Sequence, residues 1–171
     1  MEKLWSPWRS QYIDSFSETP KEEPKCIFCS ASEEGSEEKN SALVVRKGKL
    51  TFTILNLYPY NNGHLMVVPN RHLSEFSSLS VEENSEIMSE LQLAQQALLI
   101  AMKPHGFNIG ANLGKVSGAG IDAHLHFHIV PRWNGDTNFM PVLAEVKVLS
   151  EDLMQTKAKL LAAYLQISGK K

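Results

Sequence analysis

The sequence predicts an α+β fold in which an antiparallel sheet is covered by one long helix. Short β-rich runs separated by turns occupy residues 42–68 and return at 107–130. A single stretch with helical periodicity lies between the two groups and stops at Pro104. Strands that are joined by short turns pair antiparallel, so the helix is expected to cross one face of a single sheet.

The composition indicates one domain over residues 1–171, because 171 residues with 43% hydrophobic side chains can build one sizeable core. The formal net charge is −2, from 17 Lys and Arg against 19 Asp and Glu, which excludes a nucleic-acid backbone as the expected partner. There is no apolar run of signal-peptide or membrane-span length. We therefore expect a cytoplasmic protein with no membrane partner.

Residues 17–40 are predicted to be irregular, because they are acidic and rich in serine with few side chains to bury. Cys26 and Cys29 lie within this segment at a Cys-x-x-Cys spacing. That spacing fits a metal site or a redox pair, and we favour metal because the flanking sequence lacks the strand-to-helix junction typical of redox motifs. A reduced pair of exposed thiols is the alternative.

Three antiparallel strands are predicted next. Residues 42–46 and 50–55 form a hairpin around a glycine turn. A third strand, 64–68, follows the turn residues 61–63 and ends at Pro69, since proline lacks the N–H group that a sheet needs.

The long helix begins at a capping-box pattern formed by Ser80 and Glu83. Apolar residues then recur at helical spacing: Ile87, Leu91, Ala94, Leu98 and Ala101. A last helix is predicted from Ser150 to about Gln166. Between the helices, strands are predicted at 107–112 and 123–130, joined by a glycine-rich loop.

Three histidines alternate along the last predicted strand, and alternate side chains of a strand share a face. They are His124, His126 and His128. The outer two lie about 13 Å apart in a strand, so all three cannot bind one tetrahedral zinc ion and must have different roles. Each could be a hydrogen-bonded structural histidine, but three imidazoles in a row are costly without a ligand, metal or anion.

Residues 124–130 read His-φ-His-φ-His-φ-φ, where φ is apolar, and resemble the signature of the histidine-triad (HIT) superfamily. Residues 56–69, which contain Gly63-His64, look like the strand-turn-strand of this family, and residues 106–114 look like its central strand. The stretches 4–9 and 131–142 are most similar to its bacterial diadenosine tetraphosphate phosphorylase-like members.

The resemblance implies a HIT-like fold, with a five-stranded antiparallel sheet, one long helix and a C-terminal helix. The sheet is expected to continue across a homodimer, and symmetric dimers are common. Residues 26–132 would form the core of the domain, with an N-terminal zinc clip, and residues 133–171 a C-terminal extension.

The resemblance also implies roles for single residues. His126 would be the nucleophile that attacks the α-phosphorus and gives a nucleotidyl-histidine intermediate, because neutral imidazole is nucleophilic at pH 7. A backbone carbonyl on its other ring nitrogen would fix the tautomer. His128 and His64 would contact the phosphate. Asn112 would reach the phosphate or its bridging oxygen and Asn56 the ribose, although asparagines also serve in turns and at edges.

Relatives with Cys-x-x-Cys bind a structural zinc ion. The corresponding ligands here are Cys26, Cys29, His72 and His124. Two thiolates and two imidazoles complete a tetrahedral site, so the metal would clamp the N-terminal segment to the sheet instead of activating water. No organic cofactor is implied. Arg132 is as consistent with a surface ion pair as with steering an anionic substrate, and we leave it outside the predicted site.

The implied function is cleavage of adenosine polyphosphates such as diadenosine tetraphosphate, by hydrolysis or phosphorolysis. Ala119 and Gly120 stand where phosphorylases of this type carry Gly-Ser to hold the acceptor phosphate, so both acceptors stay open. One alternative is a nucleoside phosphoramidate hydrolase, which would use the same residues. Another is a nucleotide-binding zinc module without catalytic activity.

Overall fold

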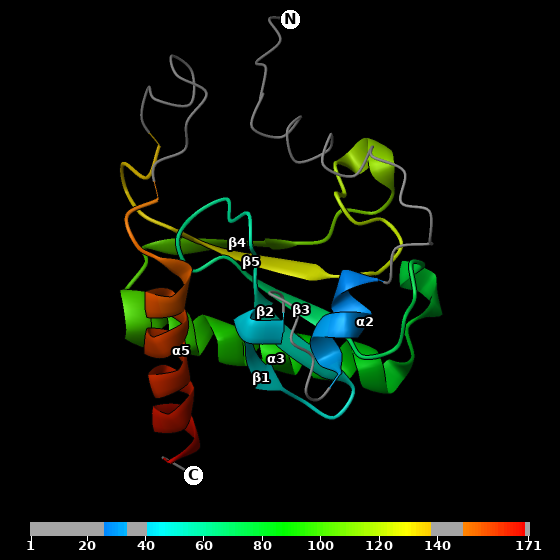
Figure 1. Ribbon diagram of the computed structural model, residues 1–171, viewed down its shortest axis with the longest axis horizontal. Helices are drawn as coiled ribbons and strands as arrows, with labels where there is room; N and C mark the ends of the chain where they lie inside the picture. The colour runs from blue at the N-terminus through cyan, green and yellow to red at the C-terminus, as the bar shows by residue number, and fades with distance from the viewer. Residues whose placement is uncertain (1–25, 34–40, 138–148, 170–171) are drawn as a thin grey trace, which may run out of the picture.

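The computed structural model describes residues 26–33, 41–137 and 149–169 (Figure 1). Its centre is a five-stranded sheet in the order β1-β2-β3-β5-β4, with antiparallel pairing between all neighbours. The strands are β1 (Val44–Lys47), β2 (Thr51–Leu55), β3 (Leu65–Pro69), β4 (Gly106–Gly110) and β5 (Phe127–Arg132). The predicted α+β class and the five-stranded antiparallel sheet are confirmed.

Three α-helices accompany this sheet within the described residues: α2 (Ile27–Ser32), α3 (Val81–Met102) and α5 (Leu153–Ser168). Helix α3 packs on β2, β3 and β5, and α5 packs on α3 and β1 (Figure 1). Every residue of β2 and β3 is buried, as expected for strands covered on both faces. In the described part of the chain, no helix has both the length and the apolar character needed to cross a bilayer.

Helix α3 begins and ends where the sequence predicts. The Ser80 hydroxyl accepts from the Glu83 N–H at 3.1 Å, and the Glu83 carboxylate accepts from the Ser80 N–H at 2.8 Å. The helix ends at Met102, and the capping residue Lys103 is left-handed (φ 48°), just before Pro104. Four predicted core positions are fully or almost fully buried: Ile87, Leu91, Ala94 and Leu98.

The N-terminal segment differs from the prediction, because residues 27–32 form helix α2 instead of irregular chain. Phe28 and Ala31 on this helix are each only 1% exposed and join the hydrophobic core. Tertiary burial therefore outweighs the polar local composition, as is common for short helices. Residues 17–25 and 34–40 of the same segment, and the motif stretches 4–9 and 138–142, lie outside the described residues.

The last strand also differs from the prediction. Strand β5 begins at Phe127, so His124 and His126 precede it and His128 is the triad histidine within the ladder. A strand needs a partner, and the pairing of β5 with β3 extends only to Phe127. Just before it, the Leu125 N–H instead donates to the Leu73 carbonyl at 2.7 Å. The chain therefore turns from the sheet toward the loop after β3.

Candidate active site and metal centre

The four predicted metal ligands lie together. One ligand atom each from Cys26, Cys29, His72 and His124 falls within 4.8 Å of all the others. Cys26 Sγ lies 3.2 Å and Cys29 Sγ 3.7 Å from His124 Nδ1, and Cys29 Sγ lies 3.3 Å from His72 Nδ1. Ligands around a tetrahedral zinc are separated by roughly 3.3 to 3.8 Å, so the cluster has close to the required dimensions.

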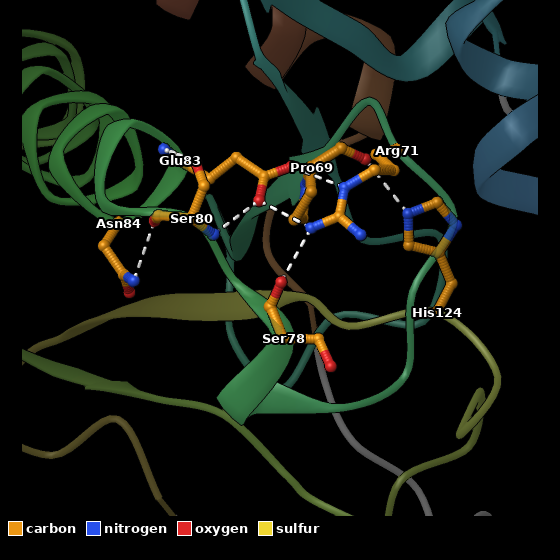
Figure 2. Close-up of polar contacts among 7 residues, drawn as sticks. All are labelled: Pro69, Arg71, Ser78, Ser80, Glu83, Asn84 and His124. Carbon is orange, nitrogen blue, oxygen red and sulfur yellow. Dashed lines mark hydrogen bonds and ion pairs between the residues drawn. The ribbon is translucent and has the colours of Figure 1, made fainter.

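The protonation of these donors also fits a metal. The His124 Nε2–H donates to the Pro69 carbonyl at 3.0 Å (Figure 2), which leaves the Nδ1 lone pair directed at the cysteines. Burial lowers the pKa of His124 to about 4, so the imidazole is neutral at pH 7. Burial and the hydrogen bond to Cys26 raise the pKa of Cys29 to about 11, so metal binding there would release a proton.

An ion pair holds the loop that carries His72. The Arg71 guanidinium donates to the Glu83 carboxylate at 2.8 and 3.0 Å and to the Ser78 carbonyl at 2.8 Å (Figure 2). The Glu83 side chain is only 7% exposed and also caps α3 through Ser80. The pKa of Glu83 is lowered, first by Arg71 and then by the Ser80 N–H. The first turn of α3 thus fixes the path of the chain beside the metal cluster.

His126 is held as a neutral imidazole with one free lone pair. Its Nδ1–H donates to the His124 carbonyl at 2.8 Å, so Nε2 carries no proton. This is the backbone carbonyl that the sequence analysis expected. The side chain is almost buried, at 6% exposure, and burial lowers the pKa of His126 below its usual value. An unprotonated Nε2 is the chemical form required of a nucleophile.

His64 and His128 form a hydrogen-bonded pair whose direction can be assigned. His64 Nδ1 accepts from the Tyr60 N–H at 3.1 Å and lies 3.3 Å from Asn56 Nδ2. Its Nε2–H therefore donates to His128 Nδ1 at 2.9 Å, and the proton of His128 is on Nε2. The rings of His126 and His128 are 4.9 Å apart. Two imidazole rings in contact thus carry a lone pair on Nε2 of His126 and an N–H group on Nε2 of His128.

The turn before His64 is built for close packing. Gly63 has a φ of +74°, and a Cβ there would lie 2.6 Å from Met102 Sδ and 2.9 Å from Leu98 Cδ2. Only glycine adopts this conformation without strain and leaves space for α3. His64 consequently enters the site fully buried, at 0% exposure.

The same turn is tied to the end of β5. Asn61 Nδ2 donates to Asp136 at 2.8 Å and to the Pro131 carbonyl at 3.1 Å. Arg132 donates twice to the Asp136 carboxylate and keeps the pKa of that group well below its usual range. Arg132 therefore forms an ion pair with Asp136. This agrees with our placing it outside the predicted site.

The two predicted substrate-binding asparagines make local bonds. Asn56 accepts from the Tyr58 N–H at 2.9 Å and lies against His64, so it borders the histidines. Asn112 donates to the Gly118 carbonyl at 3.4 Å within the loop between β4 and β5. Their contacts with a nucleotide stay a prediction.

Two aromatic residues at the site were missed by the sequence analysis. Tyr60 lies with its ring centroid 4.7 Å from that of His64. Phe28 lies 5.0 Å from His126 and 5.5 Å from His124. A partial signal for Phe28 was available in its position between the two cysteines of the predicted metal site, although the neighbouring Ile27 is only partly buried.

Comparison with known proteins agrees with this geometry. The sequence model described as HIT domain matches residues 37–135. The chain is 40% identical to the "AP-4-A phosphorylase" of Mycobacterium tuberculosis over 166 residues, which cover 95% of this chain and 83% of the relative. It is 26% identical to the asymmetrical bis(5'-nucleosyl)-tetraphosphatase of Schizosaccharomyces pombe, covering 83% of this chain and 71% of the relative.

Solved structures share the fold. A Zn-bound histidine triad family protein from Mycobacterium smegmatis aligns with a TM-score of 0.69 at 23% identity, covering 86% of this chain and 98% of that protein. A histidine triad nucleotide-binding protein from Sulfolobus tokodaii aligns with a TM-score of 0.68 at 24% identity, covering 84% and 94%.

Proposed function

The chain belongs to the HIT domain family, and on this premise we propose that it is an enzyme that cleaves adenosine polyphosphates such as diadenosine tetraphosphate. The observation that carries the proposal is that an imidazole with an unprotonated Nε2, His126, and one with an Nε2–H group, His128, have ring centroids 4.9 Å apart. The 40% identity to a protein named AP-4-A phosphorylase supports the choice of substrate class.

In the first step, His126 Nε2 attacks the α-phosphorus of the substrate. A nitrogen–phosphorus bond forms, the bond from phosphorus to the bridging oxygen breaks, and the electron pair leaves with the departing nucleotide. The His128 N–H, aimed through the chain from Tyr60 and His64, donates to a phosphate oxygen as its charge grows. The His124 carbonyl stabilises the positive charge that develops on the imidazole of His126.

In the second step, water or inorganic phosphate attacks the nucleotidyl-histidine. The nitrogen–phosphorus bond breaks and His126 regains its lone pair. Phosphorolysis of diadenosine tetraphosphate would release ADP and ATP, whereas hydrolysis at the same phosphorus would release AMP and ATP. Asn56, beside His64, is proposed to hold the ribose, and Asn112 to reach the phosphate or its bridging oxygen.

We propose zinc as the resident metal of the cluster formed by Cys26, Cys29, His72 and His124. Bound there, zinc would supply closed tetrahedral coordination and no open site for water. The four residues would hold α2 against the loop after β3 and the segment before β5. The neutral His124 with its Nδ1 directed at both cysteines supports this assignment.

We further propose a homodimer in which the sheet continues from one protomer to the next. Strand β4 (Gly106–Gly110) is at the end of the described sheet, and the middle and end of this strand are exposed. Residues 26–132 are proposed as the core of the domain, with residues 133–171 as a C-terminal extension.

The function is tested by incubating the protein with diadenosine tetraphosphate, with and without inorganic phosphate, and separating the products. We expect ADP and ATP with phosphate, or AMP and ATP with water. Two ADP molecules would contradict attack at the α-phosphorus, and failure to cleave any adenylate would support the binding-module alternative. Faster cleavage of adenosine phosphoramidate would favour the phosphoramidate hydrolase alternative, which is the activity named for a Schizosaccharomyces pombe relative at 26% identity.

The nucleophile is tested with His126→Ala and a matched control, His105→Ala. His105 is exposed and accepts a hydrogen bond from the Asn134 N–H at 3.0 Å, outside the histidine cluster. We expect turnover to fall by at least about 10³-fold in His126→Ala and to be unchanged in His105→Ala. Mass spectrometry of protein denatured at alkaline pH, where a nitrogen–phosphorus bond to histidine is stable, should detect one adenylyl group on the native chain and none on His126→Ala.

A further inference from the structure

Phe28 links the metal cluster to the proposed nucleophile. It lies in α2 between Cys26 and Cys29 and is 1% exposed. Its ring contacts that of His126 at a centroid distance of 5.0 Å and that of His124 edge-on at 5.5 Å. One side chain between the two cysteines therefore packs on both a metal-cluster residue and the reacting imidazole.

We propose that Phe28 is a positioning residue for His126, and that the Cys/His cluster holds Phe28 in place, so that metal binding and the alignment of the nucleophile are coupled. The inference deepens the proposed function and rests on it only for the choice of His126 as the reacting group. The contacts that carry it are independent of the substrate.

Helix α2 needs support from outside itself. The helix has only six residues, and Cys26 at its N-terminus makes no side-chain cap. Helices of this length are not stable alone, because nucleation costs more than a few hydrogen bonds return. Helix α2 is held by the burial of Phe28 and Ala31. It is also held by Cys26, which precedes its first residue, and by Cys29 within it, both of which belong to the cluster.

His126 is held by two groups, and both are attached to the cluster. The His124 carbonyl accepts from His126 Nδ1 at 2.8 Å, while the His124 ring offers Nδ1 to the cysteines. Phe28 packs on the ring of His126, and Cys26 and Cys29 flank Phe28 in α2. Loss of the cluster would loosen both contacts together.

In-line attack on phosphorus is sensitive to small displacements of the attacking atom. A reacting atom misplaced by 1 Å can cost about 10²-fold in rate. A hydrogen bond at one nitrogen fixes the tautomer, but an imidazole also has to be kept from tilting about that bond. The packed ring of Phe28 supplies this second restraint.

The matched comparison is Phe28→Leu against Phe52→Leu. Both phenylalanines are 1% exposed and belong to the hydrophobic core, but Phe52 lies in β2 and pairs with Val68. We expect kcat to fall about 10- to 100-fold in Phe28→Leu with KM changed less than about threefold, and both constants to be retained in Phe52→Leu. Equal losses in the two variants would show that general core damage is responsible and would overturn the proposal.

A second readout does not depend on activity. Long-range ¹⁵N–¹H spectra of the zinc-loaded protein report the tautomer of His126 and the environment of its ring. We expect the Nδ1–H tautomer in all three proteins, because the His124 carbonyl fixes it, and a shifted or split ring signal in Phe28→Leu alone. An unchanged His126 signal in Phe28→Leu would refute the positioning role, even if the native protein cleaved no adenylate.

The coupling to the metal is tested in the same spectra. Cys29→Ser, which loses a metal ligand, should shift the His126 signal in the same direction as Phe28→Leu. Phe28→Leu keeps all four ligands and should therefore still hold its zinc when a chromogenic chelator is added. If loss of zinc left the His126 signal unchanged, the coupling would be wrong. Should Phe28→Leu fail to fold, Phe28→Met, which keeps a long apolar side chain, is measured in its place with the same criteria.

Discussion

Replacement of Gly63 by alanine perturbs the turn that delivers His64 to the site. The backbone there has a φ of +74°, and the new Cβ would lie 2.6 Å from Met102 Sδ, 2.9 Å from Leu98 Cδ2 and 3.3 Å from Pro131 Cγ. The Met102 thioether is the end of a flexible side chain and can move. Leu98 is fully buried, so its side chain can move only by disturbing the neighbours packed around it.

The expected loss has two parts. A left-handed conformation costs a residue with a Cβ about 1 to 2 kcal/mol. Forcing extra volume into a packed core costs about 1 to 3 kcal/mol. Gly63→Ala should therefore lower the free energy of unfolding by about 2 to 5 kcal/mol.

Gly135→Ala separates the two parts. Gly135 has a nearly identical φ of +76°, but a Cβ there would meet nothing within 4 Å. This control should lose only the backbone part, about 1 to 2 kcal/mol, as measured by urea denaturation. Gly63→Ala should also lower kcat, because His64 follows it directly. Equal stability losses in the two variants would refute the steric argument.

Three further predictions concern the surroundings of the site. Glu83→Gln should accelerate zinc release to a chelator, because it removes the carboxylate charge that pairs with Arg71 and so loosens the loop that carries His72. Ser80→Ala should lower the free energy of unfolding by about 1 kcal/mol without affecting zinc release. Equal release rates in both variants would contradict this prediction. The carboxyl of Asp136 has a lowered pKa in the folded state, so its stabilisation is present above the unfolded value near 4 and is lost as the pH falls below it. Urea midpoints measured across this range should decline less steeply in Asp136→Asn than in the native protein. Cys29→Ser should bind less than one equivalent of zinc and unfold at a lower temperature, and an unchanged zinc content would exclude Cys29 as a ligand.

The sequence by itself determined the elements whose signals are local. The capping box of Ser80 and Glu83 and the helical spacing of Ile87, Leu91 and Leu98 specify α3, because both depend on residues three or four positions apart. The Cys-x-x-Cys spacing predicted two metal ligands, the resemblance to the family added His72 and His124, and the four residues lie together in the structure. Separate roles for the outer triad histidines stay a prediction, because the spacing argument assumed a strand that in the structure begins only at Phe127.

Only the tertiary structure decided which groups meet. Residues 123–126 look like a strand, but a ladder requires a partner, and β3 offers one only from Phe127 onward. Helix α2 exists because Phe28 is buried in a core made by distant segments. The tautomers of His126 and His128 depend on the His124 carbonyl and on the Tyr60 N–H through His64. Hydrogen bonds and burial between residues far apart in the chain arise only when it folds, and they leave no periodic pattern in the sequence.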